Sequence, residues 1–167
     1  VSIKNTAKGI QVNWNKIENA QSYIVYRRVY NASTKKWGGW SRFKDTVTST
    51  SYLDKTAKSG TYYLYTVRAE NEAGLSGYNT SGIKTRFLAT PKITSTANTN
   101  SGITVKWGKV SGATGYIVYR KTGNGGWQNL GKTTGTSFTD KKATAGVTYR
   151  YTVKAYYDSY VSAYNTN

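Results

Sequence analysis

Apolar and polar residues alternate with a period of two in several stretches of this chain. Ile10, Val12 and Trp14 fall on one side of an extended segment, and polar residues lie between them. The same arrangement returns at residues 103–107. A period of two is typical of a strand with one buried face. No segment has a convincing helical period, so the pattern predicts an all-β protein.

The chain contains an internal repeat. Residues 9–27 return as residues 102–120, and residues 51–69 return as residues 137–155. The shift between the copies is 93 residues for the first block and 86 for the second, so the first copy carries about seven extra residues. They fall near residues 29–37. We expect a first module over 1–88 with this insertion and a second over 89–167.

Short segments rich in Val, Ile, Thr and Tyr are separated by Gly, Asn and Ser turns in both copies. This composition favours a β-sandwich, a fold that needs about 100 residues, so two tandem sandwiches fit the 167 residues. The only proline, Pro91, lies where the first module should end. Its fixed φ suits a stiff junction better than a central strand.

Three motifs recur in both copies: an early-strand Trp, a Tyr-x-Val-Tyr strand, and Gly-x-x-Tyr-x-Tyr-x-Val-x-Ala. Together they resemble the fibronectin type III family almost from end to end of each copy. The resemblance implies two tandem seven-stranded fibronectin type III-like (immunoglobulin-like) sandwiches. It also implies a tyrosine corner, a phenol bonded to nearby backbone, at Tyr63 after Gly60 and at Tyr149 after Gly146.

The segments SGATGYIVYRK, GTSFTD and TYRYTVKAY are similar to repeats of large surface proteins of Gram-positive, often gut-dwelling bacteria. This resemblance implies a secreted or cell wall-attached protein. The chain starts at Val1 without Met and in mid-pattern, which indicates a fragment whose signal peptide or anchor lies elsewhere. No apolar run approaches the roughly 20 residues that span a bilayer, so we expect a soluble piece without membrane insertion.

Basic residues far outnumber acidic ones, 24 Lys and Arg against 7 Asp and Glu, for a net charge of +17. Both copies share this excess, which should attract anionic partners such as a cell-wall polymer and weaken with salt. Nucleic-acid binding is less favoured, because no recognition helix, zinc finger or ribonucleoprotein signature accompanies the charge. The chain has no Cys, His or Met, so we expect no metal, no disulfide and no cofactor. We expect a monomer.

The sequence offers few residues that could serve as catalytic groups. Asp54 and Asp140 occupy equivalent positions just before a turn, where capping of the turn explains them better than catalysis. Without His there is no base for the usual nucleophilic triad. A Ser-Lys arrangement stays open, although no spacing indicates one. We therefore predict a non-catalytic protein.

The five Trp residues divide into three kinds. Trp14 and Trp107 lie on the apolar side of an early strand and are predicted to be core. Trp40 and Trp127 follow paired glycines in both copies, which favours packing over a neighbouring strand. Trp37 belongs to the insertion and has no counterpart, so it is the best candidate for an exposed binding aromatic.

Sixteen Tyr residues give the chain a composition typical of binding interfaces. We expect outward Tyr residues beside cations, as in Tyr26 with Arg28, Tyr62 with Arg68 and Tyr119 with Lys121. The same pairs could be ordinary cross-strand contacts. The candidate binding residues gather at the insertion, where loops on a rigid scaffold carry specificity: Tyr26, Arg28, Tyr30, Lys35, Lys36, Trp37, Trp40, Arg42 and, beside them, Lys44.

Three functions remain open at this stage. The leading hypothesis is a binding module that contacts an extracellular host protein, such as an immunoglobulin or matrix protein, or a glycan. The second is a passive spacer that projects another domain from the cell wall. The third is nonspecific binding of polyanions or nucleic acid.

Overall fold

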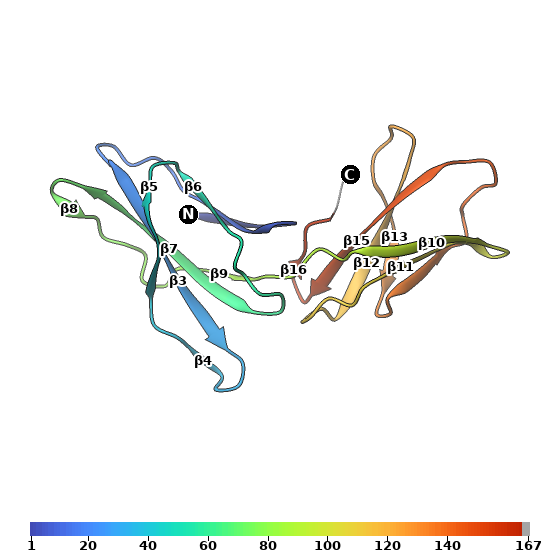
Figure 1. The fold of residues 1–167 in the computed structure, drawn as a ribbon, viewed down its shortest axis with the longest axis horizontal. Helices are drawn as coiled ribbons and strands as arrows, with labels where there is room; N and C mark the ends of the chain where they lie inside the picture. The colour runs from blue at the N-terminus through green and yellow to red at the C-terminus, as the bar shows by residue number, and fades with distance from the viewer. Residues whose placement is uncertain (165–167) are drawn as a thin grey trace. The chain divides into compact units, whose positions relative to one another are not determined.

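The structure of the protein is a computed structural model that describes residues 1–164. Contacts between residues divide the chain into two compact units, Val1–Phe87 and Leu88–Asn167, which we call unit 1 and unit 2. Within the described residues every regular element is a β-strand (Figure 1). The predicted all-β class is therefore confirmed.

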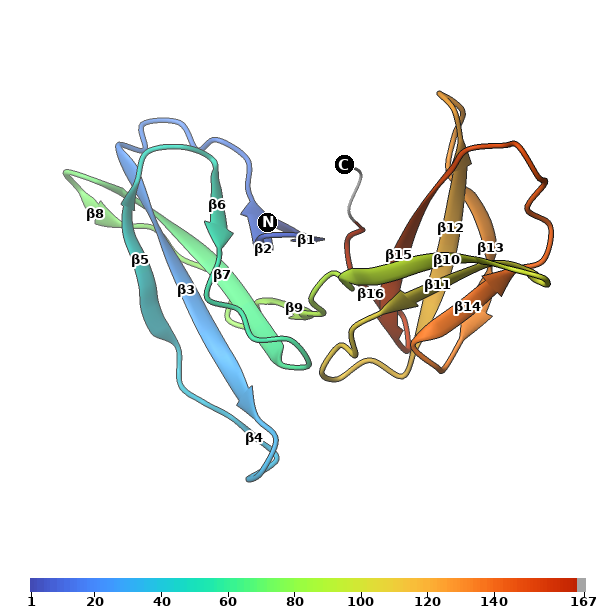
Figure 2. The ribbon, with the colours of Figure 1, turned by 45° about the vertical axis from the view of Figure 1, so that its right-hand side comes forward.

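Unit 1 contains one sheet of three strands and one larger sheet. In the three-stranded sheet the order is β1-β2-β6, and all neighbours are antiparallel. In the larger sheet β3 lies between β5 and β7, as Figure 2 shows, and β9 pairs with the start of β7. The strands are β1 (Ser2–Thr6), β2 (Gly9–Asn13), β3 (Ser22–Asn31), β5 (Ser41–Val47), β6 (Ser51–Asp54), β7 (Tyr62–Asn71) and β9 (Ile83–Arg86).

Two short strands extend hairpins of this larger sheet. β4 (Lys36–Trp37) pairs with the last residues of β3, and β8 (Gly74–Leu75) pairs with the last residues of β7. The β3–β4 hairpin contains the insertion detected in the sequence and is labelled at its tip in Figure 1. Its turn is closed by Asn31, whose side-chain oxygen accepts the backbone N–H groups of Ser33 and Thr34, and by Lys35, which has a left-handed φ of 55°.

Unit 2 repeats the arrangement with seven strands. One sheet has the order β10-β11-β14 and the other β13-β12-β15-β16. The strands are β10 (Ile93–Thr99), β11 (Gly102–Trp107), β12 (Gly115–Thr122), β13 (Gln128–Thr133), β14 (Ser137–Asp140), β15 (Tyr149–Tyr157) and β16 (Tyr160–Val161). Three strands face four in this order in both units, because β8 pairs with β7 as β16 pairs with β15, and unit 1 has β4 and β9 in addition. This is the fibronectin type III-like sandwich that the sequence predicted.

The core of each unit lies between its two sheets and is closed by a Trp. Trp14 meets the ring of Tyr23 edge-on with centroids 5.4 Å apart, and Trp107 meets Tyr116 in the same way at 5.4 Å. Both indoles are buried, as predicted. Burying a side chain of this size contributes about 2–3 kcal/mol or more to stability. The early-strand Trp therefore holds the two sheets together in both copies.

The predicted tyrosine corners are present in both units. The phenol oxygen of Tyr63 accepts the backbone N–H of Lys58 at 2.8 Å, and that of Tyr149 accepts the N–H of Thr144 at 3.1 Å. In each case the bond ties the loop before the strand to the strand itself. The Gly residues that precede them, Gly60 and Gly146, have left-handed φ values of 84° and 78°, which explains why glycine stands there.

Candidate binding surface

The candidate residues of β3 lie on one side of the larger sheet in unit 1. Tyr23 and Val25 are buried and face the core, so the residues that alternate with them beyond this point face outward. These are Tyr26, Arg28 and Tyr30. We call this side of the β5-β3-β7-β9 sheet the outer face of unit 1.

A first group of rings and cations lies at the centre of the outer face. The ring of Tyr78 stacks on Tyr26 with centroids 6.2 Å apart and meets Trp40 edge-on at 6.5 Å. The guanidinium of Arg28 lies over Trp40 at 5.7 Å, and that of Arg68 lies over Tyr78 at 5.4 Å. Cations over aromatic faces are attracted by the ring quadrupole. The group therefore combines three rings and two guanidinium groups.

A second group lies beside the insertion hairpin. Trp37 meets Tyr30 edge-on at 5.3 Å, and Tyr30 meets Tyr62 at 6.0 Å. Two cations from β9 lie over the ring of Tyr62, Lys84 at 4.9 Å and Arg86 at 4.7 Å. Trp37 is thus half-buried against its neighbours rather than protruding. The insertion extends the aromatic surface by a second group.

Hydrogen bonds hold the guanidinium groups of the first group in place. Arg28 donates from Nε to the carbonyl of Gly38 at 2.6 Å, and Arg68 donates from Nε to the carbonyl of Ser76 at 2.7 Å. Trp40 lies directly over Gly82, where an added Cβ would approach the indole to 2.6 Å. The backbone at Gly38, Ser76 and Gly82 therefore determines where these side chains lie.

The remaining predicted residues lie near these groups without joining them. Arg42 is opposite Tyr26 in the sheet and forms an ion pair with Asp45 at 2.9 Å, both largely exposed. Lys35 and Lys36 are exposed at the hairpin turn, and Lys44 is exposed on β5. The structure thus places Tyr26 and Trp40 against the ring of Tyr78, with Arg28 over Trp40, and it places Trp37 against Tyr30.

The cation–ring contacts of the structure differ from the predicted pairs. Arg28 lies over Trp40 rather than Tyr26, and Arg68 lies over Tyr78 rather than Tyr62. In unit 2 the cation over Tyr119 is Lys154. Tyr62 and Arg68 are six residues apart on β7, a rise of about 20 Å, which is too far for a contact. Side chains from neighbouring segments of the sheet approach one another much more closely.

Sequence reasoning missed three members of these groups. Tyr78 lies after β8, and Lys84 and Arg86 lie on β9, far along the chain from the insertion. Arg68 was noticed but given the wrong ring. Lys84 and Arg86 left one signal in the sequence, the alternation of cations over residues 84–86. It becomes meaningful only once β9 is known to pair with β7.

Unit 2 carries a smaller version of the first group. Trp127 and Tyr119 both contact Tyr164, with centroids 6.0 and 5.8 Å apart, and the Lys154 ammonium lies 4.4 Å from the Tyr164 ring centre. The position of Arg28 is occupied by Lys121, and that of Arg68 by Lys154. The rings are retained in both units, whereas the guanidinium groups are specific to unit 1.

The repeated carboxylates belong to a buried network rather than to a catalytic site. Asp54 is fully buried and accepts hydrogen bonds from Arg27 at 2.8 Å, from the phenol of Tyr65, and from the N–H of Thr56 at 2.8 Å. Asp140 accepts the same three kinds of donor, from Arg120, Tyr151 and the N–H of Lys142. The predicted capping of the turn is confirmed. The Arg and Tyr partners were not predicted.

The network shifts the pKa values of its members. Burial opposes ionisation of Asp54, but the hydrogen bonds from Tyr65, Arg27 and Thr56 outweigh it and hold its pKa below the usual value. Burial and the bond to Asp54 raise the pKa of Tyr65, and burial and Asp140 raise that of Tyr151. The network of unit 1 therefore holds Asp54 as its anion, and the phenols of Tyr65 and Tyr151 stay neutral.

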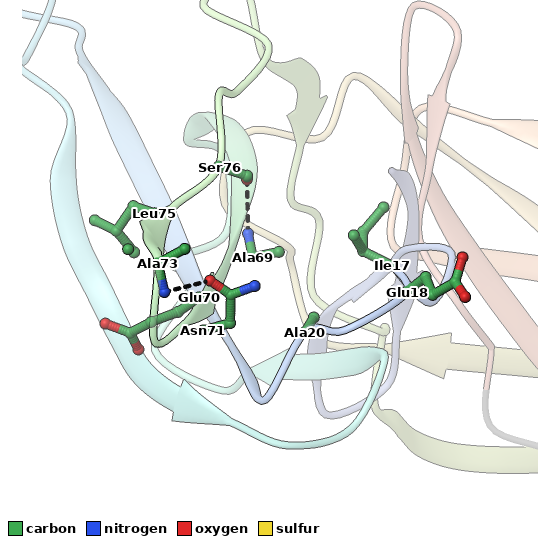
Figure 3. A pocket seen from close by; sticks show the side chains of 10 residues that line it. Ile17, Glu18, Ala20, Ala69, Glu70, Asn71, Ala73, Leu75 and Ser76 are labelled. Atoms are coloured by element: carbon green, nitrogen blue, oxygen red, sulfur yellow. Dashed lines mark hydrogen bonds between the residues drawn. The ribbon is translucent and has the colours of Figure 1, made fainter.

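A shallow pocket of unit 1 lies beside the hairpin of β7 and β8 (Figure 3). It has a volume of about 260 Å³ and is walled by the loop carrying Ile17 and Glu18 and by the β7–β8 turn with Glu70 and Leu75. Figure 3 shows the two carboxylates pointing in opposite directions. Glu70 accepts a hydrogen bond from the Ser22 hydroxyl at 2.9 Å. The pocket therefore does not present an acid and a base to one point.

Residues 1–164 contain neither a candidate metal cluster nor a membrane-spanning helix. No group of three or more His, Cys, Asp or Glu side chains in this range is placed to hold a metal ion. No helix in the described part of the chain is long and apolar enough to cross a membrane.

No family model matches the chain. Three proteins with sequence similarity are exoglucanase B of Cellulomonas fimi (34% identical over 66% of this chain), a poly(3-hydroxybutyrate) depolymerase of Ralstonia pickettii (35% over 64%) and chitinase A1 of Niallia circulans (31% over 75%). The chain spans only 11%, 20% and 20% of their respective lengths.

Two solved structures are similar to the chain. A two-domain fibronectin type III segment of chicken tenascin is 20% identical, covers 98% of this chain and 93% of its own, and has a TM-score of 0.46. The FN1–FN3 domains of chicken CNTN1 are 14% identical over 98% of this chain and 63% of theirs, with a TM-score of 0.41. The strand order and tyrosine corners of the chain itself define two fibronectin type III-like units.

Proposed function

We propose that the chain is a pair of non-catalytic modules in an extracellular or cell wall-attached protein, and that unit 1 binds an extracellular partner through its outer face. The partner is a host protein, such as an immunoglobulin or matrix protein, or a glycan. The observation that carries this proposal is the gathering of Trp37, Trp40, Tyr78 and their cations on one side of one sheet. Trp, Tyr and Arg are the residues that contribute most to binding energy at interfaces.

The absence of catalysis is supported by the use of the carboxylates. Asp54 and Asp140 are enclosed by donors within their own units, and Asp45 is paired with Arg42. The three relatives are named as enzymes, but the chain matches only a small part of each. A module that accompanies an enzyme or an adhesin without taking part in its chemistry accounts for both observations.

The test compares equivalent residues in the two units. Full chains carrying Trp40→Ala with Tyr78→Ala should lose binding to immobilised serum proteins, mucosal proteins or glycans, while Trp127→Ala in unit 2 should retain it. Circular dichroism and thermal unfolding of each variant establish that the fold survives. Equal binding by the unmodified chain, the unit 1 variant and the unit 2 variant would contradict the proposal.

A passive spacer is the second candidate function, and one observation favours it. The Trp–Tyr–Tyr group is present in both units, as expected if it stabilises the sheet face of a structural repeat. A spacer has no saturable ligand. Weak adhesion that does not saturate and that salt abolishes would favour this alternative. The unit 1 variant and the unit 2 variant should then adhere equally.

A further inference from the structure

The outer face of unit 1 carries an ordered array of cations. We propose that this array binds a linear acidic polysaccharide, a sugar polymer bearing carboxylate or sulfate groups, laid along the strands of the sheet. The inference deepens the proposed function and rests on it, because it names the chemistry of the partner at the same surface.

The strand register places the cations in successive rows. Arg68 is opposite Ile24, Arg42 is opposite Tyr26, and Arg28 is in one row with Leu64 and Lys84. Arg86 follows in the next row, opposite Tyr62. Rows of outward residues are about 6.7 Å apart, two residues of strand rise. A polymer with repeated anionic groups can meet cations at the rows of Arg68, of Arg28 with Lys84, and of Arg86.

Little negative charge opposes these cations on the same face. The carboxylates of β5 and β7 on this side are Asp45, paired with Arg42, and Glu70, bonded to Ser22 at the far end of β7. Asp54, the carboxylate that is repeated in unit 2, is buried on the inner side. Arg28, Arg68, Lys84 and Arg86 therefore form a field that favours an anionic ligand.

The rings present the cations rather than serving as the main contact. Trp40, Tyr78 and Tyr62 each have a cation over the ring, and Arg28 and Arg68 are also bonded to backbone carbonyls. A guanidinium held flat loses less freedom when its fork meets a carboxylate or sulfate. The aromatic groups thus pre-organise the charges.

The contacts between rings and cations also indicate which class of ligand fits this surface. Single-stranded nucleic acid binds by stacking bases on exposed ring faces, and those of Trp40 and Tyr78 are shared with guanidinium groups and neighbouring rings. For a protein partner this face offers Tyr78 as its exposed ring, whereas Trp37 and Trp40 are half-buried in their own groups. Repeated charge with hydroxyl groups, as in an acidic polysaccharide, fits this surface best.

The experiment measures binding of the full chain to polygalacturonate, which bears carboxylates, to dextran sulfate, and to uncharged dextran. The patch variant is Arg28→Gln/Arg68→Gln/Lys84→Gln. The matched control is Lys4→Gln/Lys8→Gln/Lys55→Gln, which removes the same charge from exposed positions elsewhere in unit 1. Unfolding curves of both variants establish that the comparison is between folded proteins.

We expect binding to at least one acidic polymer and none to dextran, with the patch variant about tenfold weaker and the control within about twofold, since each exposed ion pair contributes a factor of about two. The two acidic polymers distinguish a carboxylate ligand from a sulfate ligand. Equal weakening by the two variants would show attraction by net charge alone and would overturn the inference.

Absence of binding to both acidic polymers would also overturn it. If binding to a protein or a neutral glycan then still depended on Trp40 and Tyr78, the proposed function would stand and only the acidic polysaccharide would be rejected. If no ligand showed this dependence, both would fail.

Discussion

The two units share their interiors and differ in their outer faces. Both contain a Trp edge-on to a Tyr, a tyrosine corner, and an Asp bonded to Arg and Tyr. On the outer face, unit 1 has Arg28 and Arg68 where unit 2 has Lys121 and Lys154. Unit 1 also has the β3–β4 hairpin with its second aromatic group. The repeated features therefore maintain the fold, and the features found in one copy are where function should be sought.

The largest expected effect is the loss of the buried carboxylate. Asp54→Ala leaves Arg27 and Tyr65 without their acceptor in a fully buried site and should lower the free energy of unfolding by about 3–5 kcal/mol. Asp140→Ala should cost less, because Tyr151 is half-buried where Tyr65 is fully buried. Denaturant unfolding of the two full-chain variants makes the comparison. A smaller effect for Asp54 than for Asp140 would contradict it.

The same networks predict how stability depends on pH. The pKa of Asp54 is lower in the folded than in the unfolded chain, so its contribution is present above about pH 4 and is lost as pH falls below that value. The pKa of Tyr65 is raised in the folded chain, so its contribution is present below about pH 10 and is lost above it. Thermal unfolding at pH 3, 7 and 11 should be most resistant at pH 7. The Asp54→Asn variant should lose less thermal stability between pH 7 and pH 3 than the unmodified chain.

Removal of the tyrosine-corner hydrogen bond should lower the free energy of unfolding by a smaller amount, and the loss should differ between the two units. Tyr63→Phe removes one hydrogen bond from a buried phenol and should cost about 1–2 kcal/mol. Tyr149→Phe removes a longer bond from a half-buried phenol and should cost about 0.5–1 kcal/mol. Urea unfolding of both variants measures the difference, and an equal cost would argue against the role of burial.

The smallest expected effect concerns the guanidinium groups. Arg28→Lys with Arg68→Lys gives unit 1 the residues of unit 2 and keeps the charge. Affinity for an acidic polysaccharide should fall by about two- to threefold, because the ammonium lacks the planar fork. The reverse change, Lys121→Arg with Lys154→Arg, should raise affinity by a similar factor. No change in either variant would show that charge alone matters at this surface.

The sequence was sufficient for the fold but only partly so for the site. The repeat and the alternation of Ile10, Val12 and Trp14 predicted the sheets and the buried Trp, because side-chain direction on a strand follows directly from residue number. Tyr78 and Arg86 could not be assigned to the surface in the same way. They reach it from later strands and loops, and their neighbours are set by sheet pairing.

The sequence by itself determined the two sandwiches, their core Trp residues, the tyrosine corners and the basic charge of both copies. These depend on local periodicity and on motifs whose members lie within a few residues of each other. Only the tertiary structure decided that Asp54 meets Arg27 and Tyr65, and that Arg28 and Arg68 lie over Trp40 and Tyr78. Such contacts join strands that are distant along the chain, and their distances are fixed by the register between strands and not by spacing in sequence.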